Sequence, residues 1–247
     1  MRRAAARSQC ANNLKQIALA LHNYADTNPV GHWSALPAGT VPSADLGPDS
    51  RLSWVVALLP YVEQDHLYRQ VRLAEAWDAE DNLRATQTPL KLMHCPDWGR
   101  EADPNPPYLT AYVGVTGVGP DAATLPLGDR RAGAFGQDRR LALADFTDGT
   151  SNTLLVLESA RDNGPWARGG TATLRSLNPT EQPYLGAGRP FGGTHFAENS
   201  VFGRGKPVGC NAAMADGSVH FFRAAVSPQA LEALATAAGG DDAGPDW

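Results

Sequence analysis

The chain has 247 residues, of which 43% are hydrophobic and 19% charged, so it is long enough to bury a substantial core. Its formal net charge is −5 and no block of Lys or Arg continues past Arg7, which argues against a nucleic-acid-binding surface. No run of about 18 apolar residues is present, so we expect no membrane-spanning helix within these residues. The 25 glycines and 19 prolines predict short strands, many turns and long loops.

The first element predicted is a long helix over residues 3–25. Its apolar positions recur every three or four residues and so fall on one face. This predicted packing and assembly face consists of Leu14, Ile17, Leu21 and Tyr24, with Cys10 at its start. Pro29 disfavours helical geometry at the residue before it, so the helix should end there.

The remaining elements follow in order as short helices, then strands, then one more helix. Ser53 is the expected cap of a helix interrupted at Pro60. Residues 108–119 and 152–160 have strand patterns, Asp216–Gly217 is the predicted turn of a hairpin, and Ser227 caps a last helix. This order predicts an α+β fold in which the long N-terminal helix packs on an antiparallel β-sheet. We expect residues 1–26 to form the helix, 27–240 a single globular domain and 241–247 a flexible tail.

Four oxygen-bearing residues surround the glycine turn of "ADFTDGTSNT" and could bind calcium: Asp145, Asp148, Asn152 and Glu158. Their spacing is not that of an EF-hand loop. The alternative is that Asp148 and Gly149 form a turn whose neighbours satisfy backbone groups. No other cofactor is predicted.

The histidines and cysteines form no recognisable catalytic or metal-binding motif. None of the six histidines forms an HExxH pair, and Cys10, Cys95 and Cys210 include no CxxC pair, which argues against a structural zinc site. Ser151, His195 and Asp216 could form a Ser-His-Asp catalytic triad, but many other combinations of three residues fit equally well. The sequence therefore predicts no catalytic residues.

Seven segments, in order, closely resemble the DUF1559 family of prepilin-like bacterial proteins, described as prepilin-type-processing-associated proteins with a His-x9-Asp-Gly motif. The segments are "RRAAARSQCANNLKQIALALHNYAD", "LSWVVALLPYVEQDHLY", "LMHCPD", "YVGVTG", "FTDGTSNTLLVLES", "MADGSVHFF" and "LEALATAAGG". The corresponding motif residues are Asp148, Gly149, Ser151, Asn152, His195, Asp216 and Gly217. The position where the motif requires histidine is Lys206, so His195 is the displaced counterpart and "FAENSVFGRGKPVG" looks like an insertion.

The resemblance implies a pilin-like or pseudopilin-like fold and an extracytoplasmic location, periplasmic or at the cell surface. Family members typically begin with a basic leader and an apolar helix, so it also implies that this chain lacks the membrane-spanning half of its first helix. In that compartment a Cys10–Cys95 disulfide becomes reasonable, with Cys210 free; the alternative is two separate buried thiols. In the entropic model such a disulfide contributes about 4 kcal/mol to stability.

Three functions are compatible with these expectations. The first is a non-enzymatic structural subunit that assembles with other pilin-like subunits or with secretion or pilus machinery, anchored to the membrane through the missing segment. The second is a binding module that recognises a glycan or peptide through loop aromatics such as Trp33, Trp98 and Trp166, although structural packing is an alternative role for each. The third is a hydrolase using His195 or an acidic metal site.

Overall fold

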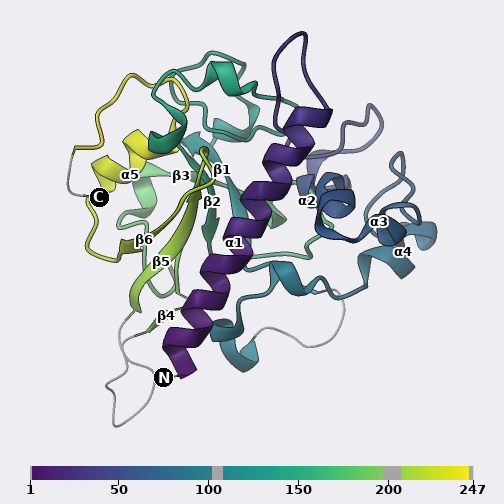
Figure 1. Cartoon of the computed structure of the whole chain (residues 1–247), viewed down its shortest axis with the longest axis horizontal. Helices are drawn as coiled ribbons and strands as arrows, with labels where there is room; N and C mark the ends of the chain where they lie inside the picture. The colour runs from purple at the N-terminus through teal and green to yellow at the C-terminus, as the bar shows by residue number, and fades with distance from the viewer. Residues whose placement is uncertain (1, 102–107, 194, 197–206, 245–246) are drawn as a thin grey trace.

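The structure is a computed structural model that describes residues 2–101, 108–193, 195–196, 207–244 and 247. It combines a long N-terminal helix, a mixed sheet and a group of short helices (Figure 1). The predicted α+β class is therefore confirmed. None of the helices in the described ranges is long and apolar enough to cross a membrane.

The long helix α1 spans Arg2–Thr27 and runs between the sheet and the short helices (Figure 1). Leu14, Ile17 and Leu21 are fully buried on the chain's own body, and each contributes about 1.5–3 kcal/mol by burial. The buried surface is wider than the predicted narrow face, because Asn13 and several alanines are buried as well. The packing expected of this face is thus satisfied within the chain, and any contact with another subunit must use other residues of α1.

The sheet contains six strands in the order β3-β1-β2-β5-β4, with β6 paired to β5. The strands are β1 (Tyr112–Val118), β2 (Leu154–Glu158), β3 (Leu174–Leu177), β4 (His195–Phe196), β5 (Pro207–Met214) and β6 (Val219–Arg223). β1 and β3 run parallel, whereas the other pairs are antiparallel. The expectation of a purely antiparallel sheet was wrong, because β3 comes from the loop-rich region after β2, which carried no clear strand pattern.

The sheet is buried on both faces. Successive residues of a strand point to opposite faces, and Tyr112 and Val113 of β1 accordingly belong to two separate core clusters. The first cluster holds the buried residues of α1. The second holds Leu231 and Leu234 of the last helix, α5 (Pro228–Ala235). The sheet therefore forms the middle layer of the molecule, between α1 and α5.

The short helices α2 (Trp54–Leu58), α3 (Asp65–Tyr68) and α4 (Glu80–Thr86) lie on the other side of α1 from the sheet (Figure 1). Ser53 caps α2 as predicted, because its hydroxyl accepts a hydrogen bond from Val55 N at 3.2 Å. The predicted interruption at Pro60 appears as a 3₁₀ turn over Leu59–Val62.

The predicted C-terminal hairpin and helix cap are also present. The turn between β5 and β6 contains Asp216 and Gly217, and Gly217 adopts a φ of 81°, which favours glycine. Ser227 caps α5 by accepting from Ala230 N at 3.1 Å. In the segment expected to be a flexible tail, Trp247 stacks on Phe222 of β6 with ring centroids 5.7 Å apart.

Two residues of α1 provide a matched test of this packing. Ile17 is fully buried, whereas Leu19 is 59% exposed on the same helix. We expect Ile17→Ala to lower the free energy of unfolding by about 2–5 kcal/mol, because it leaves a cavity under α1. Leu19→Ala should change it by less than about 0.5 kcal/mol. Urea unfolding of both variants measures the difference, and equal losses would contradict the observed orientation of α1.

Candidate functional site

The sheet register brings a buried histidine and a buried glutamate together. β6 occupies one edge of β5, so β2 and β4 lie one after the other along the opposite edge. Glu158 ends β2 next to the Leu157–Ala212 pair, and His195 of β4 pairs with Gly209. Both side chains are nearly inaccessible to solvent, with 0% and 2% of their surface exposed.

Both ring nitrogens of His195 face carboxylates. Its Nε2 lies 3.0 Å from one oxygen of Glu158 and 3.1 Å from the other. Its Nδ1 lies 2.9 Å from Oδ2 of Asp97, which is in the 3₁₀ helix Pro96–Glu101. The side-chain amide nitrogen of Asn211 also lies 3.2 Å from Nε2. Because a carboxylate can only accept hydrogen bonds, the two carboxylates favour an imidazolium with a proton on each nitrogen.

Glu158 is held by further hydrogen bonds from β5. The backbone N–H of Asn211 donates to Oε2 at 2.7 Å, and its side-chain amide donates to Oε1 at 2.9 Å. These contacts fix the carboxylate toward the imidazole. Asp97, Glu158, His195 and Asn211 together are called the His195 network below.

The electrostatics of the His195 network favour the charged form of the histidine. Burial by itself lowers the pKa of His195, but the hydrogen bonds and negative charges of Glu158 and Asp97 outweigh it and raise the pKa above its ordinary value. Burial and the nearby Glu158 also raise the pKa of the free Cys210 thiol, which lies on β5.

A disulfide lies beside this network. Cys10 of α1 and Cys95, both fully buried, are bonded to each other, with their Cα atoms 5.3 Å apart. The disulfide is close to the His195 network. The potential ligand atoms of Cys10, Cys95, Glu158 and His195, one from each side chain, all lie within 4.8 Å of one another. The pairing implied by the family resemblance is therefore present, and Cys210 is the free cysteine. The bond joins residues 85 apart in sequence, so it removes about 4–5 kcal/mol of chain entropy from the unfolded state.

Polar contacts of α1 surround the disulfide. The buried side-chain amide of Asn13 donates to the carbonyl of His94 at 2.9 Å and to the hydroxyl of Tyr112 at 3.2 Å. The hydroxyl of Tyr112 in turn donates to the carbonyl of Cys10 at 3.4 Å. Burial raises the pKa of Tyr112 strongly, so its hydroxyl stays a donor. One turn of α1 is thus joined both to the Cys95 segment and to the sheet.

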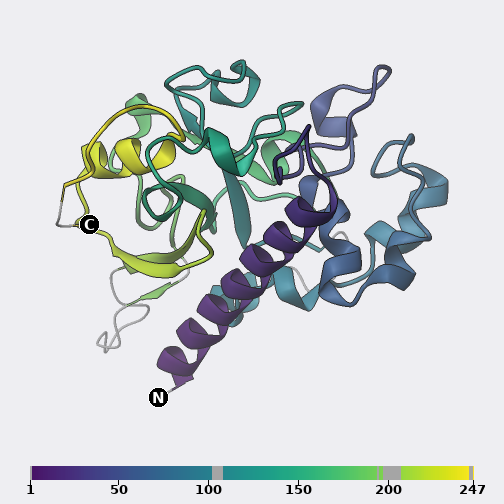
Figure 2. The same ribbon diagram turned by 45° about the horizontal axis from the view of Figure 1, so that its top comes forward.

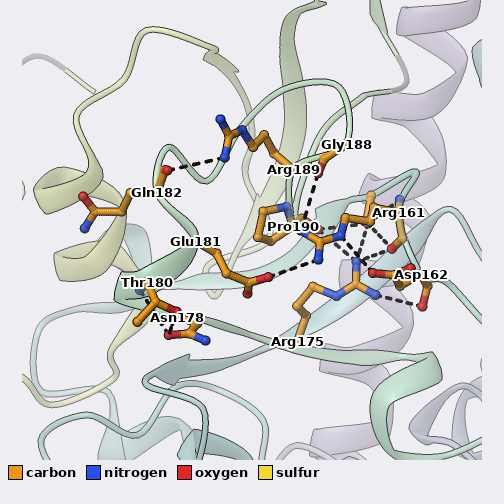
Figure 3. Close-up of polar contacts among 11 residues, drawn as sticks. Arg161, Asp162, Arg175, Asn178, Thr180, Glu181, Gln182, Gly188, Arg189 and Pro190 are labelled. Carbon is orange, nitrogen blue, oxygen red and sulfur yellow. Dashed lines mark hydrogen bonds and ion pairs between the residues drawn. The ribbon is translucent and has the colours of Figure 1, made fainter.

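The loop after β2 is joined to the segment that precedes the histidine strand. Gly192 pairs in parallel with Ser159, and its N–H donates to the carbonyl of Glu158 at 2.8 Å. The guanidinium of Arg175 lies among the loop segments and donates to the Ser159 hydroxyl at 2.6 Å and to the Pro190 carbonyl at 2.9 Å (Figure 3). Burial lowers the pKa of Arg175 to about 10, which still leaves it charged at neutral pH. Arg175 therefore joins the start of the loop after β2 to Pro190, which precedes the histidine strand in the chain.

Two ion pairs of Arg161 lie next to the contacts of Arg175. The guanidinium of Arg161 contacts Asp162 at 2.8 Å and Glu181 at 3.1 Å (Figure 3). All three side chains are at least one third exposed, so these pairs contribute little stability by themselves. The Arg161–Glu181 pair joins the segment after β2 to the 3₁₀ helix Pro179–Glu181.

The residues considered for calcium do not form one site. Asp145 accepts from Ala142 N at 2.9 Å, and Asp148 accepts from Gly239 N at 2.7 Å and from Gly240 N. Asn152 donates to the backbone carbonyl of Asp148 at 3.0 Å. Glu158 lies at the far end of β2, in the His195 network. The contacts of Asp148 and Asn152 fit the alternative, a turn at Asp148–Gly149 whose neighbours satisfy backbone groups.

The hypothetical Ser151, His195 and Asp216 triad is not assembled. Ser151 is exposed in a 3₁₀ turn, and Asp216 accepts from Ser218 N at 2.8 Å within its own hairpin. The ring of His195 is committed to Glu158 and Asp97 instead.

The two Asp-Gly motifs are turns that contact each other, and the second of them also contacts α1. Asp216 N donates to the carbonyl of Thr150, next to Gly149, which has a φ of 94°. The ammonium group of Lys15 on α1 donates to the carbonyl of Gly217 at 2.6 Å. These motif residues therefore position the β5–β6 hairpin against the long helix.

The loop tryptophans differ in exposure. Trp98 and Trp166 are 6% and 1% exposed, so the packing role holds for both, and Trp33 is exposed. A groove of about 330 Å³ lies elsewhere, between α1 and the short helices. Its aromatic and apolar lining includes Tyr24, Trp54, Tyr61, Tyr68 and Leu73.

Sequence reasoning missed Asp97, Asn211 and Asn13 as parts of the site. Asp97 follows Cys95 in "LMHCPD" and Glu158 ends "LLVLES", so both lie in segments that carry the family resemblance. Strand pairing and the disulfide bring these segments together in the folded chain. The spacing of the residues along the chain does not predict that contact.

Comparison with known proteins identifies the family to which the chain is similar. The family model described as "Protein of unknown function (DUF1559)" matches residues 1–229. No curated protein and no solved structure matches the chain.

The His195 network should make stability depend on pH in the disulfide-bonded protein. The pKa of His195 is raised in the folded state, so its contribution is complete below the ordinary value of 6.5 and is lost as the pH rises through the folded-state value. We therefore expect wild type to exceed His195→Gln in melting temperature by more at about pH 6 than at about pH 9. Differential scanning calorimetry of both proteins measures this gap; a gap that is constant or grows with pH would contradict a charged His195.

Proposed function

The chain belongs to the DUF1559 family, and we propose that it is a pilin-like structural subunit that acts outside the cytoplasm in a membrane- or filament-associated assembly. The observation that carries the proposal is the position of α1. Residues 4–9 are mostly exposed, and Figure 2 shows this end of α1 extending beyond the sheet, whereas the helix from Cys10 onward packs on the body.

The disulfide supports a load-bearing role for α1. It lies at the residue where α1 leaves the body, so a force applied along the exposed turns passes directly to the Cys95 segment and the sheet. Noncovalent helix packing alone could be peeled away turn by turn, because each turn contributes only a few kcal/mol. A covalent link at the exit point prevents that peeling.

The disulfide also supports the proposed compartment. Disulfides form and persist in oxidising environments outside the cytoplasm and are rare in cytosolic proteins. An extracytoplasmic location agrees with the prepilin-like character that the family resemblance implies. Partners would be other pilin-like subunits or the secretion or pilus machinery that assembles them.

Photo-crosslinking in cells tests whether the exposed turns of α1 contact other subunits. A photo-reactive amino acid replaces Ser8, which is exposed on these turns, or Leu127, which is 56% exposed in a loop away from α1. This design adds no cysteine that could disturb the native disulfide. We expect a crosslinked species with twice the mass of the chain from position 8 and none from position 127.

Two outcomes would contradict the proposal. If neither position yields a dimer, α1 does not contact a second copy. If both yield the same amount, the contact is not specific to α1. Fractionation of the same cells should place the crosslinked species with the membrane or the cell surface; recovery in the cytosol would reject the compartment.

A second function, a peptide-binding module, is favoured by the groove between α1 and the short helices. The polar groups around it are largely committed: the hydroxyl of Tyr61 bonds to Thr27 and Asn28, and Arg140 donates to the backbone carbonyls of Leu36 and Ala35. Few free donors remain for sugar hydroxyls. An extended, proline-containing peptide fits better, since aromatic-lined grooves bind such segments through ring contacts.

Two leucines provide a matched test of this second function. Leu73 lines the groove and is 40% exposed, whereas Leu127 is 56% exposed away from it. In a screen of proline-containing peptides by fluorescence polarisation, Leu73→Asp should weaken binding at least about tenfold, because it places a charge in the apolar lining. Leu127→Asp should leave the affinity unchanged. No peptide binding, or equal losses in both variants, would reject the module.

A further inference from the structure

Four potential metal ligands meet in the core. The Sγ atoms of Cys10 and Cys95, a carboxylate oxygen of Glu158 and a ring nitrogen of His195 lie within 4.8 Å of one another, and all four residues are buried. In a tetrahedral zinc site with ordinary bond lengths, ligand atoms lie about 3.3–3.8 Å apart. Only small side-chain shifts separate this cluster from that geometry once the sulfur atoms are no longer bonded to each other.

The surroundings also match those of a metal site. Asp97 accepts from Nδ1 of His195 at 2.9 Å, and Nε2 is the ring nitrogen that lies beside Glu158. Metal-bound histidines typically donate their other ring N–H to a carboxylate in this way, which fixes the ring and raises its basicity. Asn211 orients the Glu158 carboxylate through two hydrogen bonds. The cluster therefore has both the ligands and the groups that would position them.

We propose that the reduced protein binds one Zn²⁺ ion through Cys10, Cys95, Glu158 and His195. A dithiol reductant transfers two electrons and two protons to the Cys10–Cys95 bond and becomes a disulfide itself, which leaves two thiols. Zn²⁺ then binds the two thiolates, Nε2 and a Glu158 oxygen. The thiol protons and the Nε2 proton leave to solvent, as expected for ligands that must be deprotonated.

Zinc and the disulfide then perform the same structural task in alternation. Each joins α1 at Cys10 to the Cys95 segment, and zinc additionally joins both to β2 and β4. The reduced chain would keep its long helix fastened before oxidation, and the bound metal would protect both thiols from mispairing with Cys210.

Zinc titration of the full chain in its two redox states tests the proposal. The protein is reduced under anaerobic conditions with a phosphine, which takes up one oxygen atom from water as the disulfide becomes two thiols, and the reagent is removed. Zinc is then added in competition with a chromophoric chelator. We expect one equivalent bound per reduced chain and none per oxidised chain. Absence of stoichiometric binding to the reduced chain, or equal binding in both states, would overturn the proposal.

Cobalt and variants identify the ligands. Co²⁺ bound to the reduced chain should show a thiolate charge-transfer band and the visible spectrum of a tetrahedral site, and an octahedral spectrum without that band would overturn the assignment. Cys95→Ser should abolish the band, whereas Cys210→Ser is the matched control and should retain it. Asp97→Asn keeps every ligand and should weaken zinc binding about 10–100-fold. The titration of the reduced and the oxidised wild-type protein tests zinc binding without any variant. A variant that fails to fold therefore does not prevent the test.

Discussion

The attachment of α1 at Cys10 is the constraint on which the rest of the structure depends. Residues 4–9 of the helix are mostly exposed, and at Cys10 the helix enters the core, where it is covalently bonded to Cys95. Asn13 and Tyr112 add hydrogen bonds within the same turn. The attachment at Cys10 therefore sets the position from which the rest of α1, including Ile17, packs into the core.

The sheet topology explains why a charged network can exist beside that attachment. β2 and β4 share one edge of β5, so Glu158 and His195 meet without being close in sequence. A buried histidine would otherwise be neutral, because burial disfavours its charged form. Two facing carboxylates reverse that preference, and Asn211 donates two hydrogen bonds to the Glu158 carboxylate.

The same centre connects the proposed function with the proposed metal site. A subunit that bears load through its N-terminal helix needs a firm joint where the helix meets the body. In the proposed extracytoplasmic compartment the Cys10–Cys95 disulfide would form that joint, and zinc would form it in the reduced chain. Two turns with family motifs also contact each other near α1: Lys15 of α1 donates to the carbonyl of Gly217, and Asp216 N donates to the carbonyl of Thr150.

Local pattern was enough to predict α1, the cap at Ser53, the Asp216–Gly217 hairpin and the α+β class, because helix periodicity, caps and turns depend on residues close together in the chain. The parallel pairing of β3, the burial of Asn13 and the His195 network were decided only by tertiary structure. Asp97, Glu158 and His195 come from three distant segments, and nothing in their spacing encodes a contact. Strand register and one disulfide bring them together, so their chemistry exists only in the folded chain.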